Sequence, residues 1–306
     1  VVLDELHKMP GWTSFAKGVY DVEGMSPPLL ITGSARLDLG RRTGESMAGR
    51  FFRYRLHPFD VKEVASQVAP DEALERVLTV GGFPEPFLDG TEEYYKRWRR
   101  SHLEAILRRD LLDLVVVSDL HSVELLVDML RERVGNPVSY ASLARDLNKD
   151  PKTIKRWLEL LEELYVVFPV RPWHRNVARS VVKEPKYYFY DTAQVSPQGG
   201  ARLENAVACS VLKTLELEED RDGAVRSLNF VRTRDGKEID FAVVKESTVT
   251  HLIEVKEGDS SLSPSFRIVR DSFPNARRGQ LVRHPTREKT WPSGEELRPA
   301  ARFLVE

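Results

Sequence analysis

The sequence has 306 residues, which fits about two domains. Hydrophobic residues make up 41% and charged residues 30%, a balance that excludes collagen, coiled coil and wholesale disorder. Because 46 Lys and Arg residues face 47 Asp and Glu residues, the net charge is only -1, and any nucleic-acid site must be a local basic patch.

The cysteine content and the apolar runs bear on where the protein works. The single cysteine, Cys209, excludes an internal disulfide framework and a Cys-rich zinc site, and it favours a cytoplasmic location. No apolar run approaches the ~18–20 residues of a membrane span, so no membrane partner is expected. The chain begins Val-Val-Leu-Asp-Glu rather than with Met, and we interpret it as the C-terminal portion of a longer protein.

Residues 1–65 predict a parallel α/β unit. Apolar runs at 1–3 and 29–32 are typical of strands, and the spacing of apolar residues over 12–20 indicates a helix between them. Functional groups of parallel sheets follow the carboxyl ends of the strands. The polar residues Asp4 and Glu5, and then Gly33 and Ser34, occupy those positions.

These strand ends have the order of an ATPase site. Asp4 and Glu5 match a Walker B motif, in which the Asp orients the magnesium of bound ATP and the Glu polarises the attacking water. Ser34 ends a run typical of a sensor strand, whose polar tip contacts the nucleotide phosphate or the water. Arg50, in Ser-Met-Ala-Gly-Arg-Phe, is a candidate arginine finger. Acidic strand ends are common, so the order of the motifs carries more weight than any one of them.

Residues 66–195 predict a helical region that contains a winged helix-turn-helix. Ser139 and Asp150 are expected to cap two helices, and Pro151 suits the first position of the second helix. Apolar residues recur at helical spacing in that second helix, which predicts a buried face made of Ile154, Trp157, Leu158 and Leu161.

The outer face of the second helix is basic, which favours DNA binding in a major groove. Strands at 165–170 and 186–190 are expected to form the arms of the wing, with further basic residues between them. The predicted DNA contacts are Lys152, Lys155, Arg156, Arg175 and Arg179. The alternative is a winged helix used for packing or protein contacts, and acidic residues later in the helix favour that alternative mildly.

Residues 196–306 predict a helix over 203–217, an acidic solvated loop over 216–222, strands at 228–232, 238–244 and 250–255, and an irregular basic tail. The last two strands form a hairpin through a short polar turn. Side chains alternate along a strand, so Glu254 and Lys256 share a face, and Asp240 lies on the partner strand within reach of it.

Two carboxylates beside a lysine suit a metal-dependent phosphodiester site. Asp240 and Glu254 are candidate ligands for Mg²⁺ or Mn²⁺, Lys256 can act on the attacking water or the phosphate, and Glu204 is a candidate third carboxylate. This Asp…Glu-x-Lys arrangement, preceded by a helical Glu, resembles the PD-(D/E)XK nuclease superfamily. The alternative is a solvated strand edge of mixed charge, which is a common feature of sheets. Even a nuclease-like fold does not guarantee nuclease activity.

In their order, the motifs resemble a large prokaryotic AAA-type ATPase family whose C-terminal half is a domain of unknown function. The resemblance extends to about residue 285 and includes Asp-Glu-x-x-x-x-Pro-Gly-Trp, Thr-Gly-Ser, Ala-Gly-Arg, Gly-Gly-Phe-Pro-Glu-Pro and Ile-Glu-Val-Lys. It implies an ATP-binding protein that can form homo-oligomers through its ATPase core. The phosphate-binding Gly-x-x-x-x-Gly-Lys-Ser/Thr motif does not occur in these 306 residues. ATP is therefore expected as a cofactor of the longer protein only.

Three functional hypotheses follow from these patterns. In the first, ATP turnover in the longer protein controls a winged helix and a metal-dependent nuclease-like domain that act on nucleic acid, most simply DNA. In the second, the nuclease fold is degenerate and serves as an ATP-switched DNA- or protein-binding module. In the third, the protein is an ATPase of the chaperone or signalling type that uses the helix-turn-helix only for packing.

Overall fold

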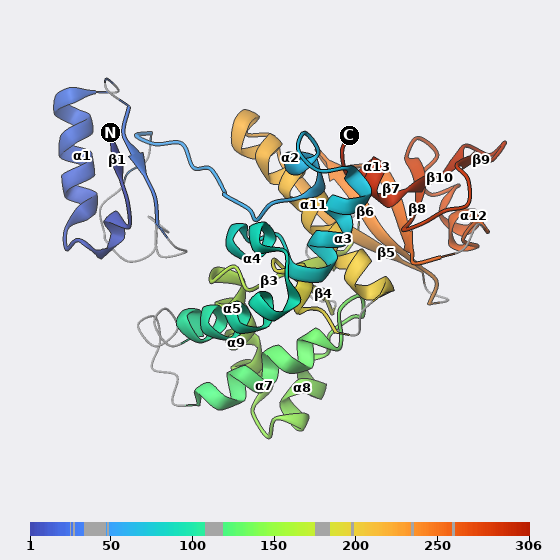
Figure 1. Cartoon of the computed structure of the whole chain (residues 1–306), viewed down its shortest axis with the longest axis horizontal. Helices are drawn as coiled ribbons and strands as arrows, with labels where there is room; N and C mark the ends of the chain where they lie inside the picture. Colours follow the sequence, from blue (N-terminus) through green and yellow to red (C-terminus); the bar gives the residue numbers. More distant parts are fainter. Residues whose placement is uncertain are drawn as a thin grey trace.

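The computed structural model describes residues 1–24, 26, 28–33, 47, 49–107, 119–174, 184–196, 199–233, 236–258 and 261–306. The first lobe is a small α/β unit, coloured blue in Figure 1. Its strands β1 (Val2–Leu3) and β2 (Leu30–Ile31) pair in parallel, and the 3-10 helix η1 (Leu6–Lys8) and helix α1 (Trp12–Glu23) lie between them in the chain. This order confirms the parallel α/β arrangement that the apolar runs predict. Its small core consists of Leu6, Trp12, Ala16 and Met47.

Residues 51–60 run from the first lobe to the rest of the chain without regular secondary structure (Figure 1). The Arg55 guanidinium lies 2.9 Å from Glu219 Oε2 and also binds Asp220, and His57 Nε2 lies 2.6 Å from Glu216 Oε2. These acidic residues belong to the last turns of helix α11 (Gly200–Asp222), so the expectation of a solvated loop over 216–222 is wrong. The acidic run stays helical because basic groups from the connecting segment and the sheet neutralise it.

The middle of the chain is mainly helical, as the sequence predicts. Helix α3 contributes Leu74, Leu78 and other buried side chains to the main core, and Pro70 stands at its first position, where a missing N–H costs nothing. The helices that precede the helix-turn-helix are α2 (Val61–Val64), α3 (Pro70–Val80), α4 (Pro84–Asp89), α5 (Glu92–Ala105) and α7 (Leu120–Arg131).

The two helices predicted as a helix-turn-helix are α8 (Tyr140–Asp146) and α9 (Pro151–Glu163). Asp150 caps α9 by accepting a hydrogen bond from the Lys152 backbone N–H at 2.6 Å. Ser139 precedes α8 but makes no side-chain capping hydrogen bond, so that expectation is wrong. The predicted apolar face of α9 is buried in the main core, which confirms Ile154, Trp157, Leu158 and Leu161.

The strands after α9 belong to an eight-stranded mixed sheet whose order is β4-β3-β5-β6-β7-β8-β10-β9. Strands β3 (Val167–Pro172) and β4 (Lys186–Phe189) pair antiparallel, as expected for the arms of a wing. Strand β3 also pairs in parallel with β5 (Arg226–Arg232), through Arg171↔Asn229 and Pro172↔Phe230. The predicted wing strands and the predicted nuclease-like strands therefore share one hydrogen-bonded sheet.

The last 30 residues are regular, although the sequence predicts an irregular tail. They contain β8 (Arg277–Val282), β9 (Lys289–Thr290), β10 (Glu295–Pro299) and α13 (Ala300–Phe303). The charged residues of this segment obscure its strand pattern in the sequence, but some of them are paired inside the fold. The fully buried Glu295, for example, forms ion pairs with both Arg270 and Arg278. Such a pairing between distant residues leaves no local signal in the sequence.

Candidate functional site

The site predicted around Asp240 is built on the hairpin of β6 (Glu238–Lys245) and β7 (Thr248–Lys256). Glu246 and Ser247 form its two-residue turn, with φ angles of 49° and 69°. Positive φ at both turn residues matches the twist of the flanking strands. The register pairs Phe241 with Ile253, so Asp240 and Glu254 are the next cross-strand neighbours toward the end of the hairpin.

The buried carboxyl group of Glu254 and the half-buried carboxyl group of Asp240 are in direct contact. Asp240 Oδ2 accepts a hydrogen bond from the Val255 backbone N–H at 2.8 Å, and Glu254 Oε1 accepts one from Ser263 Oγ at 2.5 Å. Burial, followed by the charge and hydrogen bond of Glu254, raises the pKa of Asp240 to about 7. Two buried like charges repel, so the pair either holds a proton or requires a cation.

A fixed cation already lies beside this pair. Lys186, at the start of β4, has a side chain that is only 1% exposed, and its Nζ lies 2.6 Å from Glu238 Oε1 and 3.3 Å from Glu204 Oε1. Although burial disfavours the ammonium charge, the surrounding Glu204, Asp240 and Glu238 raise the pKa of Lys186 above its usual value. The lysine therefore stays charged and compensates part of the acidic cluster.

Glu204, on α11, joins the cluster from the helical side. Its Oε1 accepts a hydrogen bond from the Tyr188 hydroxyl at 2.6 Å and also pairs with Lys186. Burial raises the pKa of Glu204, and Lys186 opposes that rise. A Cβ added to Gly135 would lie 2.9 Å from Glu204 Oε2, so the backbone of the segment before α8 touches this carboxylate.

Lys256 lies at the open side of the cluster. Its side chain is 43% exposed, and its Nζ lies 3.7 Å from Glu254 Oε2. The structure therefore brings the four residues predicted for this site into one neighbourhood. Glu204, however, is occupied by Lys186 and Tyr188.

The residues present fit a hard divalent cation bound through two protein carboxylates. Within the described ranges, no group of three or more His, Cys, Asp or Glu residues is placed to hold a metal ion. Mg²⁺ usually keeps several waters and binds through one or two carboxylates, so Asp240 and Glu254 form an adequate donor set. The repulsion that raises the pKa of Asp240 is what such an ion would relieve.

Sequence reasoning missed several residues that hold this site together. Ser263 and Gln280 form a buried network behind Glu254, in which Gln280 Oε1 accepts from the Ser263 backbone N–H at 2.8 Å. Lys186 and Tyr188 lie in the Lys-Tyr-Tyr-Phe strand. The local signal for Lys186 is its position as the first residue of an apolar strand. A lysine buried at such a position needs carboxylate partners, so it indicates that carboxylates lie nearby.

The ATPase-like residues of the first lobe are only partly brought together. Asp4, at the end of β1, accepts a hydrogen bond from the Thr32 hydroxyl, so the Walker B-like and sensor-like strand ends meet. Glu5 Oε2 pairs with Lys8 at 2.6 Å. Arg50 Nε pairs with Asp21 of α1 at 3.0 Å rather than with either strand end. The predicted Ser34 lies outside the described residues.

The candidate DNA-contacting residues of α9 are all exposed. Lys152, Lys155 and Arg156 lie on the face opposite the buried one, and Lys155 makes a long ion pair with Glu159 at 3.7 Å. Arg175 and Arg179 lie outside the described residues. No described helix is both long and apolar enough to cross a bilayer.

Comparison with known proteins finds two family models that each match a part of the chain. Residues 1–65 match the model of an AAA domain, and residues 71–196 match a domain of unknown function (DUF8612). Two curated relatives are 31% identical over 192 residues, namely the uncharacterized proteins Mb2031c of Mycobacterium bovis and Rv2008c of Mycobacterium tuberculosis. The alignment covers 63% of this chain and 42% of each relative, so the chain spans under half of their length. No solved structure matches the chain.

Proposed function

We propose that the chain is the C-terminal effector portion of an AAA-type ATP-binding protein that acts on DNA through a winged helix and a metal-dependent, nuclease-like site. The single observation that carries the proposal is the contact between the half-buried carboxyl group of Asp240 and the buried carboxyl group of Glu254, with Lys256 on the same strand face as Glu254. Buried like charges with a raised pKa are typical of functional sites, because a stable core avoids them.

In this proposal Asp240 and Glu254 hold Mg²⁺ or Mn²⁺, which supplies Lewis-acid polarisation of a phosphodiester when bound. Val255 holds the Asp240 carboxylate through its backbone N–H, and Ser263 holds Glu254. Lys256, which is half-exposed, orients the attacking water or stabilises charge on the phosphate. Glu204 is not required as a ligand, and it positions Lys186 instead.

Two contacts support joint action of the helix-turn-helix and the nuclease-like site. Gly135, which precedes α8, lies directly against Glu204. Strand β3, which follows α9, pairs with β5, the neighbour of β6. DNA held by Lys152, Lys155 and Arg156 would therefore be bound by the same rigid unit that carries Asp240.

The ATPase part of the proposal concerns the longer protein. The match of residues 1–65 to an AAA domain and the contact between Asp4 and Thr32 support an ATP site completed by residues beyond this chain. Assembly into a homo-oligomer through this core, with Arg50 as a finger toward a neighbouring copy, is part of the same proposal.

The test combines metal binding with DNA nicking. Calorimetric titration with Mg²⁺ or Mn²⁺ is expected to show saturable binding that Asp240→Asn and Glu254→Gln remove, and the same variants are expected to lose plasmid nicking. Glu246→Gln is the matched control, because Glu246 is an exposed carboxylate at the far end of the same hairpin. Nicking that persists in Asp240→Asn would reject the assignment of the site.

One observation favours a second candidate, the non-catalytic binding module with a degenerate nuclease fold. Lys186 already neutralises part of the carboxylate cluster from inside the protein. In that case DNA or a partner protein binds without a divalent cation, and no cleavage occurs. Absence of metal binding together with retained DNA affinity would select this candidate over the first.

A further inference from the structure

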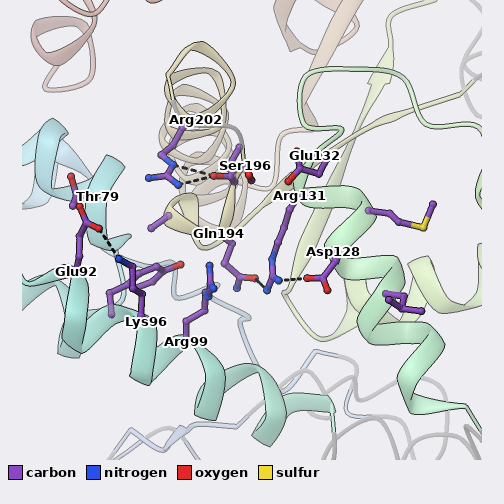
Figure 2. A pocket seen from close by; sticks show the side chains of 15 residues that line it. Thr79, Glu92, Lys96, Arg99, Asp128, Arg131, Glu132, Gln194, Ser196 and Arg202 are labelled. Carbon is purple, nitrogen blue, oxygen red and sulfur yellow. Dashed lines mark hydrogen bonds and ion pairs between the residues drawn. The ribbon is translucent and has the colours of Figure 1, made fainter.

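A cavity of about 690 Å³ lies away from the carboxylate site, between α5, α7 and the start of α11. Figure 2 shows it with Arg99 of α5, Arg131 of α7 and Arg202 of α11 around the same space. Its volume is in the usual range for small-molecule sites, which is roughly 300–1,000 Å³. Nothing in the proposed nuclease-like or DNA-binding chemistry uses this cavity.

The three arginines carry more positive charge than their partners neutralise. Arg99 lies over the Tyr95 ring, with its guanidinium carbon 5.8 Å from the ring centroid. Arg202 donates only to carbonyl oxygens, those of Leu78 at 2.9 Å and Val195 at 2.7 Å. Among the described residues, no carboxylate pairs with either arginine.

Arg131 is paired, and its one unpartnered nitrogen is buried. It binds Asp128 and donates to Gln194 Oε1 at 2.8 Å, yet its buried Nε has no hydrogen-bond partner. Burial lowers the pKa of both Arg131 and Arg202, and the nearby charge of Arg99 contributes to the decrease. The positive charges of these guanidinium groups therefore repel one another in a partly desolvated space.

The remaining lining limits what can bind. Lys96 is paired with Glu92 at 3.1 Å, and Glu132 is an exposed carboxylate of the lining, so four basic side chains face three acidic ones around the cavity. Asp191, behind Tyr95, is buried, and burial raises its pKa to about 6. Apolar surface is also present, and it comes from Leu125, Met129, Ala193 and Val195.

We propose that this cavity binds a phosphate monoester with a compact apolar or planar body, of the class of a nucleoside monophosphate. Arg99 and Arg202 present unneutralised guanidinium donors to the phosphate, and the Arg131–Asp128 pair borders the same space. The body lies against Leu125 and Met129. The cavity does not include the residues of the proposed metal site, so the test of one proposal does not decide the other.

The experiment is calorimetric titration of the chain with three probes: inorganic phosphate, adenosine monophosphate and adenosine. The monophosphate is expected to bind best, phosphate more weakly, and adenosine not measurably. Arg99→Gln is expected to weaken monophosphate binding about tenfold or more, which is the usual loss for one charge-assisted hydrogen bond. Within the described residues Arg99 makes a ring contact but no hydrogen bond or ion pair, so Arg99→Gln is expected to leave the fold intact.

Arg100→Gln is the matched control, because it removes the same charge from an exposed position of the same helix. Arg99→Lys keeps the charge without the planar fork and is expected to bind at an intermediate level. If Arg100→Gln and Arg99→Gln weaken binding equally, the proposal is overturned, since the effect is then general surface charge. Saturable binding of phosphate but not of the monophosphate would overturn the proposal in favour of a site for free phosphate. Equal binding of adenosine and the monophosphate would also overturn it, because the phosphate group would then contribute nothing to affinity.

Discussion

The Lys186 ammonium group lies 2.6 Å from the Glu238 carboxylate, at a point where the lysine side chain is only 1% exposed. Glu204 approaches the same ammonium group from α11. One buried cation therefore ties the first residue of strand β4 to helix α11 and to the hairpin that carries the candidate metal ligands. Four predictions follow from this arrangement and from its surroundings.

Lys186→Met is expected to destabilise the protein by about 3 kcal/mol or more, because it leaves buried carboxylates without their counter-charge. Urea unfolding at pH 7 measures the change. Lys245→Met is the control, since Lys245 pairs with Glu218 at a site that is 37% exposed, and such pairs contribute about 0–1 kcal/mol. Equal losses in the two variants would contradict the compensating role of Lys186.

The raised pKa of Asp240 makes stability depend on pH in a definite direction. Its pKa is about 7 in the folded chain, against 3.8 for an unperturbed aspartate. The folded state therefore binds more protons than the unfolded state between these values, so this residue's contribution falls as pH rises from about 4 to 7. Unfolding free energies over that window are expected to decline more steeply in the wild type than in Asp240→Asn. A steeper decline in the variant would contradict this burial of Asp240.

Gly135→Ala is expected to disturb the carboxylate cluster from outside it. Gly135 has a φ of 81°, and its added Cβ would meet Glu204 Oε2 at 2.9 Å. The left-handed backbone alone costs a non-glycine residue about 1–2 kcal/mol. The midpoint temperature of thermal unfolding is therefore expected to decrease, and the affinity of the site for Mg²⁺ is expected to change with it. Gly223→Ala is the control, because it has a φ of 75° with open space around it, so it carries the backbone cost alone.

The α9 surface is expected to bind DNA through phosphate contacts. Replacing Lys152, Lys155 and Arg156 by Gln should reduce the slope of log affinity against log salt by about 0.9 for each lost phosphate contact on duplex DNA. Fluorescence anisotropy at several salt concentrations gives that slope. The control replaces three exposed arginines elsewhere, Arg97, Arg100 and Arg302. An unchanged slope in the α9 variant would favour a packing role for the helix-turn-helix.

The local patterns that the sequence predicts well are those carried by neighbouring residues. The buried face of α9, the β6–β7 hairpin and the parallel pair β1–β2 all depend on apolar spacing and turn residues within one segment. The proximity of Asp240 and Glu254 follows from the same hairpin register. The roles of Lys186 and of Gly135 against Glu204 depend on contacts between segments far apart in the chain, and no local pattern encodes them.

The pairing of β3 with β5 sets how the chain can be divided for study. A fragment that begins at residue 196 would keep Asp240 and Glu254, but it would leave the backbone of β5 at Asn229 and Phe230 without its β3 partner. Such an open edge invites pairing with other molecules. It would also lose Lys186, the cation that compensates the buried carboxylates. Boundaries for isolated expression therefore belong before Arg55, which pairs with α11, and not within the sheet.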